Sequence, residues 1–512
     1  MEKGSQNRTK YSMLNALSAI ALTLVNGIFG IVVTRLVISR FGSDFNGLNS
    51  TANQIINVLL ILEGGFTLAS NVALFAPMSA GDYGTSNSVL KATRNKFKRI
   101  AVIFLAIGVT VAFLYSLAVK SALPREFVFT VILMAVVPQA FNLYYTTTYR
   151  VLLQTQQREF IISGFTALTI GLGHITNIIL ITHGGKMFMV RLVTMIFAIL
   201  NCFLITGYTR RKNRFLDFSV EARPELIKGT NDVMAQKITG VIYTSWPIVF
   251  LSISPSGGTM LASVYAVYNN VFVMLKALLH GVIDAPRLGF GQMLTERKRE
   301  EVWGAFKEYE FVAVFFTYIA LTTAYALILP FVAIYTRGVS DINYYDTTIA
   351  LLMVIIGSVE MLHIPSGHII NMSGNFRVSK NFQILACAVL IVSMSVLGTV
   401  FGVYGMLGSL LLVAILLAVL EIGWVHTKFF EGKTAEYILM GLPFLLCGAL
   451  SAFAESLLTK GMSSVRGFLL YGVVLTALNS AAALAIGLLF SRNETKRLFL
   501  RVSGLIKRFT KS

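Results

Sequence analysis

Apolar segments of about 20 residues recur along the 512-residue chain, and short polar or basic stretches separate them. A helix needs roughly 20 apolar residues to cross the ~30 Å hydrocarbon core of a bilayer. Only 13% of the residues are charged, whereas a soluble domain carries about 25%. These features predict an all-α fold, that of a polytopic membrane protein.

The hydropathy pattern predicts fourteen transmembrane helices, centred near residues 25, 62, 109, 137, 170, 197, 242, 273, 319, 357, 388, 415, 446 and 478. The polar, basic segment 1–10 precedes an apolar run that has no small-residue cleavage site. We therefore interpret that run as the first span and not as a removed signal peptide.

The basic residues give the expected orientation. With the N-terminus in the cytoplasm, roughly three quarters of the 43 Lys and Arg residues fall in segments predicted to be cytoplasmic. The external loops contain only Arg40, Lys120, Arg125, Lys186, Arg337, Lys460 and Arg466. This distribution explains the net charge of +19 better than nucleic-acid binding does, and it predicts that both termini are cytoplasmic.

Short matches at an offset of about 216 residues indicate an internal repeat. Segment 47–55 aligns with 263–271, Gly65 with Gly281, and Gly185 with Gly402. Two six-helix lobes related by a parallel repeat, plus two C-terminal helices, account for these matches, and such repeats favour a transporter. The predicted parts are an N-terminal lobe (1–212), a basic linker (213–230), a C-terminal lobe (231–430), the last two spans (431–490) and a basic cytoplasmic tail (491–512).

Four ionisable residues form one line in the eighth predicted span: Lys276, His280, Asp284 and Arg287. At about 100° per residue they share one narrow face of a continuous helix. An ionisable group inside a membrane is costly unless it is paired or faces water. The line therefore predicts either a set of buried ion pairs, such as Asp284 with His280, or a cation-lined path for an anion.

Other spans carry further candidates. Asn26 lies on a stripe of small polar residues in the first span, where Arg35 follows as an interfacial anchor or an anion ligand. Arg150 belongs to an interfacial polar cluster at the end of the fourth span, which is either structural or part of the substrate path. Candidates for ion coupling or pairing are Glu63, Asp284, Glu360 and His363, the last two as a local pair or a proton-responsive site.

Several motifs are absent from the sequence. It has no Walker P-loop, HExxH, CxxC or GxSxG motif, and no loop long enough for a catalytic domain. The cysteines Cys202, Cys387 and Cys447 lie far apart in apolar segments, which indicates neither a disulfide nor a metal site. We therefore expect a protein that is not an enzyme and needs no cofactor.

The chain resembles a known family in its plan of six, six and two spans and in three short motifs: Arg40-Phe41-Gly42, Leu153-Gln154-Thr-Gln-Gln-Arg158 and Val264-Tyr265-Ala-Val-Tyr268-Asn269. It is similar to the O-antigen and capsule-type polysaccharide flippases of the multidrug/oligosaccharidyl-lipid/polysaccharide exporter superfamily. The resemblance covers essentially the whole chain.

This resemblance implies two lobes around a cationic cavity in a bacterial cytoplasmic membrane. It implies that an undecaprenyl-diphosphate-linked oligosaccharide crosses by alternating access for export of a cell-surface polysaccharide. Coupling to H⁺ or Na⁺ is also implied, and the expected partners are the lipid-linked glycan, membrane lipids and other membrane proteins of polysaccharide assembly. Lys276, His280 and Asn26 fall in spans that line the cavity in such proteins.

Three alternatives remain at this level. A lipid II-type flippase has the same general plan. A cation-coupled multidrug exporter of the same superfamily is disfavoured by the two extra spans and by Lys276. A membrane glycan polymerase is disfavoured because the chain has no large external loop.

Overall fold

The computed structural model describes residues 2–227, 230–284 and 286–509, and within these ranges the chain forms helices and no strands. The predicted linker and tail each extend beyond the described part, at residues 228–229 and 510–512. The chain divides into two compact units, Met1–Ser263 and Val264–Ser512. The predicted boundaries of lobes, linker and tail remain predictions.

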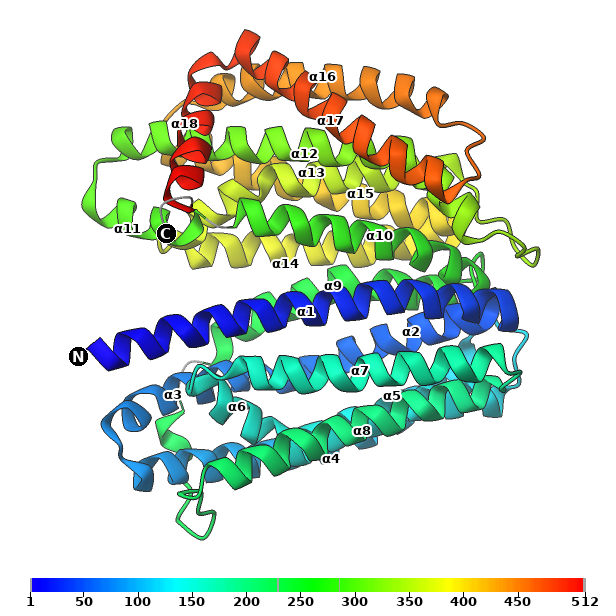
Figure 1. Ribbon diagram of the computed structural model, residues 1–512, viewed down its shortest axis with the longest axis vertical. Coiled ribbons are helices and arrows are strands. Elements are labelled where there is room, and N and C mark those ends of the chain that lie inside the picture. Colours follow the sequence, from blue (N-terminus) through cyan, green and yellow to red (C-terminus); the bar gives the residue numbers. More distant parts are fainter. Residues whose placement is uncertain (1, 228–229, 285, 510–512) are drawn as a thin grey trace. The chain divides into compact units, whose positions relative to one another are not determined.

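Unit 1 contains nine helices within its described residues (Figure 1): α1 (Glu2–Phe41), α2 (Ser43–Leu59), α3 (Phe66–Ala80), α4 (Tyr83–Ala118), α5 (Arg125–Phe141), α6 (Thr147–Thr155), α7 (Glu159–Thr182), α8 (Met187–Lys212) and α9 (Thr230–Ile253). The helix α1 packs along α7, α7 packs against α8, α4 against α5, and α2 against α9. A π-helical turn (η2, Asn142–Thr146) joins α5 to α6.

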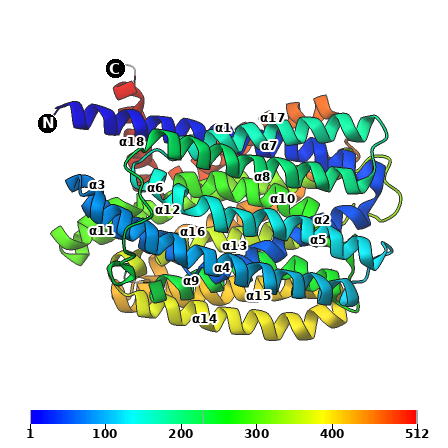
Figure 2. The same cartoon turned by 90° about the horizontal axis from the view of Figure 1, so that it is seen from below.

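Unit 2 begins within α10 (Thr259–Ile283) and continues through α11 (Arg287–Glu296), α12 (Arg299–Tyr335), α13 (Thr347–Met372), α14 (Phe376–Ser393), α15 (Thr399–Trp424), α16 (Thr434–Leu458), α17 (Val465–Phe490) and α18 (Arg492–Phe509). The central helix is α12, which packs against α13, α16 and α17. The helix α13 also packs against α15, and α14 against α15 (Figure 2).

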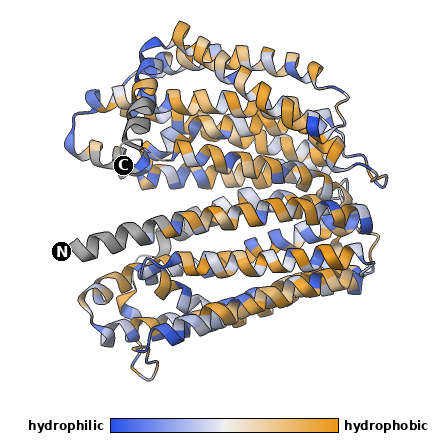
Figure 3. Cartoon of the chain, viewed as in Figure 1, coloured by the Kyte–Doolittle hydropathy of each residue, from blue (hydrophilic) through white to orange (hydrophobic). Residues whose placement is uncertain are grey.

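The helices are apolar along most of their length, and hydrophilic residues concentrate at their ends and in the connections (Figure 3). Eleven helices among the described residues are long and apolar enough to cross a membrane, or up to twelve if one bent pair counts as a single span. The predicted all-α, polytopic membrane fold is therefore confirmed. The predicted number of fourteen spans is not confirmed.

Three places account for the difference in number. The second predicted span breaks between η1 (Leu60–Glu63) and α3, where Gly64 and Gly65 have φ of 57° and 73°, and the two parts are bent by 48°. The seventh lies on α9 (Thr230–Ile253), of which the stretch Ile238–Ile253 counts as a shorter apolar helix. The eleventh and twelfth count together as one 54-residue stretch, Phe376–Phe429.

The long stretch Phe376–Phe429 does not continue as one straight helix. Its 54 residues would extend about 80 Å at 1.5 Å per residue, far more than the ~30 Å hydrocarbon core. The backbone leaves the helical region at Gly402, with φ 58° and ψ −130°, a conformation that glycine adopts readily because it has no Cβ. The break lets α14 pack back against α15.

The matched glycines of the internal repeat differ in structure. Gly65 lies at the break before α3, whereas its partner Gly281 lies inside the uninterrupted α10. Gly185 and Gly402 both lie where one apolar segment turns into the next. The two halves of the repeat therefore agree better in the order of their segments than in the local backbone conformation at each matched position.

Candidate functional site: a polar cluster on α10 and α13

The line of charge that the sequence predicts on one helix is divided in the structure. The helix α10 ends at Ile283, and Arg287 is the first residue of α11. Pro286 directly precedes α11, and proline has no backbone N–H with which to continue the hydrogen-bond ladder of α10. The prediction of four residues on one continuous helix is therefore wrong for Arg287, an exposed residue. Asp284 directly follows α10, and its N–H still donates to the His280 carbonyl at 2.8 Å.

Lys276 has a partner that the sequence reading did not assign to it. Its Nζ lies 2.8 Å from Oε2 of Glu360, near the middle of α13. The two side chains are 25% and 13% exposed. Because this pair lies inside the apolar spans of both helices, each charge offsets part of the cost of placing the other there.

Asp284 lies between two histidines. Its carboxylate is 3.3 Å from Nδ1 of His280 and 3.6 Å from Nε2 of His368 on α13. The predicted Asp284–His280 contact is therefore present. His368 is a residue that the sequence reading missed, and its Nδ1 lies 2.7 Å from the hydroxyl of Tyr309 on α12.

Glu360 and His363, which one reading of their i, i+3 spacing pairs with each other, each contact a residue on another helix. Nδ1 of His363 lies 2.8 Å from Oε2 of Glu421 on α15. Gly367 makes room for Glu421, since a Cβ there would lie 2.8 Å from the same oxygen. Glu421 interrupts an apolar run in the sequence, a signal from which it could have been found.

The α10–α13 polar cluster thus consists of Lys276, His280, Asp284, Glu360, His363, His368 and Glu421. It lies within unit 2. Among the residues that the structure describes, no group of three or more His, Cys, Asp or Glu side chains could hold a metal ion. The cluster thus combines an ammonium group in an ion pair with histidine and carboxylate groups that can gain and lose protons.

The remaining predicted residues belong to unit 1. Asn26 and Arg35 are exposed on α1. Arg150 is half-buried on α6, and its Nε has no hydrogen-bond partner among the described residues. Glu63 ends η1 and accepts a hydrogen bond from the Thr67 hydroxyl.

Comparison with known proteins places this fold among membrane transporters. No protein-family model matches the chain, and no curated protein matches it. The solved structure of the lipid II flippase MurJ, in an inward closed conformation, has a TM-score of 0.68 at 13% identity and covers 93% of this chain and 99% of its own.

A multidrug resistance MATE family transporter of the MOP superfamily, in an inward-facing conformation, has a TM-score of 0.62 at 14% identity, with 83% and 99% covered. An outward-facing structure of a transporter of that description has a TM-score of 0.51 at 12% identity, with 84% and 97% covered. At these identities the likeness shows the fold alone: the chain has the fold of the MurJ and MATE transporters.

Proposed function

We propose that this protein is a flippase that moves an undecaprenyl-diphosphate-linked oligosaccharide across the cytoplasmic membrane of a bacterium by alternating access, for export of a cell-surface polysaccharide. Both termini are then cytoplasmic. The observation that carries this proposal is Lys276, a partly exposed ammonium group within a membrane-spanning helix of a chain with a transporter fold.

The chemistry of the substrate fits such a group. A diphosphate carries negative charge through a slab of low dielectric constant, and a fixed cation offsets the cost of removing that charge from water. His280, half-exposed one turn from Lys276, is a second group that can donate to phosphate oxygens. The lipid tail can remain among the bilayer chains while the headgroup crosses.

A lipid II-type flippase is the second candidate, and the likeness to MurJ favours it. Both candidates move a lipid-linked anion, so Lys276 has the same role in each. A multidrug exporter of cationic compounds is the third. The likeness to the MATE structures supports it, whereas an ammonium group in the path disfavours a cationic substrate.

The test is deletion of the gene, followed by measurement of lipid-linked glycan on the inner leaflet and of polysaccharide at the cell surface. We expect the glycan to accumulate inside and surface polysaccharide to fall. Complementation by Lys276→Ala should be poor at normal protein level. Lys460→Ala, an exposed lysine between α16 and α17, is the matched control and should complement fully.

Three outcomes would redirect the assignment. Full surface polysaccharide with Lys276→Ala would remove Lys276 from the substrate path. A deletion strain that accumulates lipid II points to the second candidate. Normal glycan display combined with sensitivity to cationic drugs points to the third.

A further inference from the structure

The pair between Lys276 and Glu360 poses a problem for an anionic substrate. The ammonium group that would bind the headgroup is already bound to a carboxylate, 2.8 Å away. An arriving diphosphate and Glu360 must therefore compete for Lys276 or share it. Lysine has three N–H donors, so sharing is geometrically feasible, but it places two anions side by side in a partly buried site.

Two anions beside one ammonium group repel each other strongly where water is scarce. One of them can relieve the repulsion by taking up a proton, because a neighbouring like charge favours the neutral form of a carboxylate. We propose that binding of the anionic headgroup at Lys276 is linked to uptake of one proton by Glu360. This inference rests on the proposed function, which supplies the anion.

The groups around Glu360 support this assignment. Tyr265 of α10 lies close enough to interact electrostatically with Glu360. His363 follows three residues later on α13 and is engaged by Glu421, so the neighbourhood contains a second carboxylate, and Lys276 contacts Glu360 directly. When the headgroup takes Lys276, Glu360 loses this contact and gains a neighbouring negative charge.

The other titratable groups packed on α13 lie farther along it. Tyr309 of α12, Asp284 and Arg287 surround His368, eight residues beyond Glu360. His426 of η5 (Val425–Phe429) faces Glu310 of α12. On α14, Arg377 and Lys380 lie near the helix start, beyond the end of α13. Among these groups, Glu360 is the one in direct contact with Lys276, so an anion bound at Lys276 affects it directly.

Linkage between anion binding and proton uptake has a measurable consequence. If the complex binds one more proton than its separate parts, affinity for the anion rises as the pH falls, by at most about tenfold per pH unit. By reciprocity, the bound anion increases the affinity for that proton by the same factor. Such a link couples substrate occupancy to proton occupancy at one pair of residues.

The experiment uses the full chain in lipid nanodiscs and farnesyl diphosphate as the probe. Titration calorimetry in HEPES and in Tris, two buffers with different ionisation enthalpies, gives the number of protons taken up on binding. We expect the wild type to take up as much as one proton more than Glu360→Gln does. The titration of the probe itself cancels in that difference. At pH 8 we expect Glu360→Gln to bind the probe several-fold more tightly, because the competing carboxylate is gone.

Two further variants make the result specific. Glu360→Asp retains a carboxylate and should retain proton uptake, which keeps the test valid if Glu360→Gln folds poorly. Glu436→Gln removes a carboxylate that pairs with Lys433 at 3.0 Å and Lys307 at 3.4 Å, outside the α10–α13 polar cluster, and should match the wild type.

Equal proton uptake by the wild type and Glu360→Gln, with binding that still requires Lys276, would overturn the linkage alone. Failure of the wild type to bind farnesyl diphosphate would overturn the proposed function together with the linkage. Tighter binding of inorganic diphosphate than of farnesyl diphosphate would overturn the assignment of a lipid-linked headgroup.

Discussion

Glu310 on α12 and His426 on η5 form a pair with 3.1 Å between the carboxylate oxygen and Nε2, and their side chains are 1% and 0% exposed. The other nitrogen of His426, Nδ1, lies 2.9 Å from the carbonyl of Ile422. Trp303 and Phe306 pack against the imidazole. The pair joins α12 to the segment that follows α15, beside a buried hydrophobic cluster that includes Val302, Phe306 and Val425.

This pair predicts a large effect on stability. Removing one partner of a buried pair leaves the other without compensation, which costs roughly 3–5 kcal/mol. We therefore expect Glu310→Ala to lower the thermal unfolding temperature strongly and Glu310→Gln to lower it less, because the amide can still bond to His426. Thermal unfolding of the purified protein measures both, and equal losses would contradict a hydrogen-bonded role for the carboxylate.

Substitution of Asp284 should change the affinity for an anionic ligand and have little effect on stability. Its carboxylate and the His280 ring are 43% and 44% exposed, and exposed pairs contribute at most about 1 kcal/mol. Asp284→Asn removes a negative charge one turn from His280, on the side of α10 that carries Lys276. We expect farnesyl diphosphate to bind a few-fold more tightly to Asp284→Asn, with an unchanged unfolding temperature. Weaker binding would mean that Asp284 orients a ligand group.

The close approach around Gly47 predicts a steric effect in unit 1. A Cβ at this residue would overlap the backbone carbonyl of Thr259, next to the hydrogen bond from Asn46 Nδ2 to the Ser263 hydroxyl at 2.7 Å. Gly47→Ala should therefore reduce the yield of folded protein and the unfolding temperature. Gly30→Ala is the matched control, because nothing lies within 4 Å of its Cβ position, and it should be neutral or slightly stabilising.

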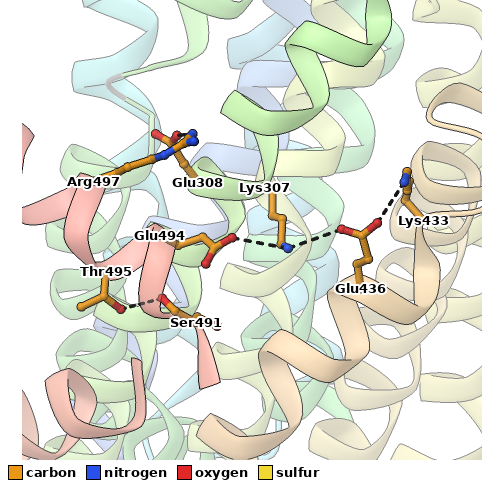
Figure 4. Close-up of polar contacts among 8 residues, drawn as sticks. All are labelled: Lys307, Glu308, Lys433, Glu436, Ser491, Glu494, Thr495 and Arg497. Atoms are coloured by element: carbon orange, nitrogen blue, oxygen red, sulfur yellow. Dashed lines mark hydrogen bonds and ion pairs between the residues drawn. The ribbon is translucent and has the colours of Figure 1, made fainter. Parts of the chain in front are cut away.

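A charge cluster holds the C-terminal helix α18 (Figure 4). Lys307 of α12 lies 3.4 Å from Glu494 and 3.4 Å from Glu436, and Arg497 pairs with Glu308. We expect Glu494→Lys to repel Lys307 and to raise the rate of proteolysis within α18. The double variant Lys307→Glu/Glu494→Lys should restore part of the protection, and proteolysis at low salt measures both. Equal cleavage of all three proteins would show that apolar packing alone holds α18.

The membrane class and the order of the helices follow from the sequence alone. Each of the fourteen predicted centres lies in a helical segment, because a segment long and apolar enough to cross a bilayer can satisfy its backbone hydrogen bonds internally only as a helix. It also identified Lys276, His280, Asp284, Glu360 and His363 as costly groups that require a partner or water. The prediction of one continuous helical line through Arg287 missed the end of α10 at Ile283, although a proline in the sequence signals a helix boundary.

Which of these groups contact each other depends on how the helices pack. Lys276 pairs with Glu360 and His363 with Glu421, across separations of 84 and 58 residues. Such pairs depend on how each helix is rotated about its axis and shifted along its neighbour. Packing of apolar side chains sets that rotation and shift, and helical periodicity contains no information about a neighbouring helix. The sequence therefore identified charges that need partners, and helix packing selected the partners.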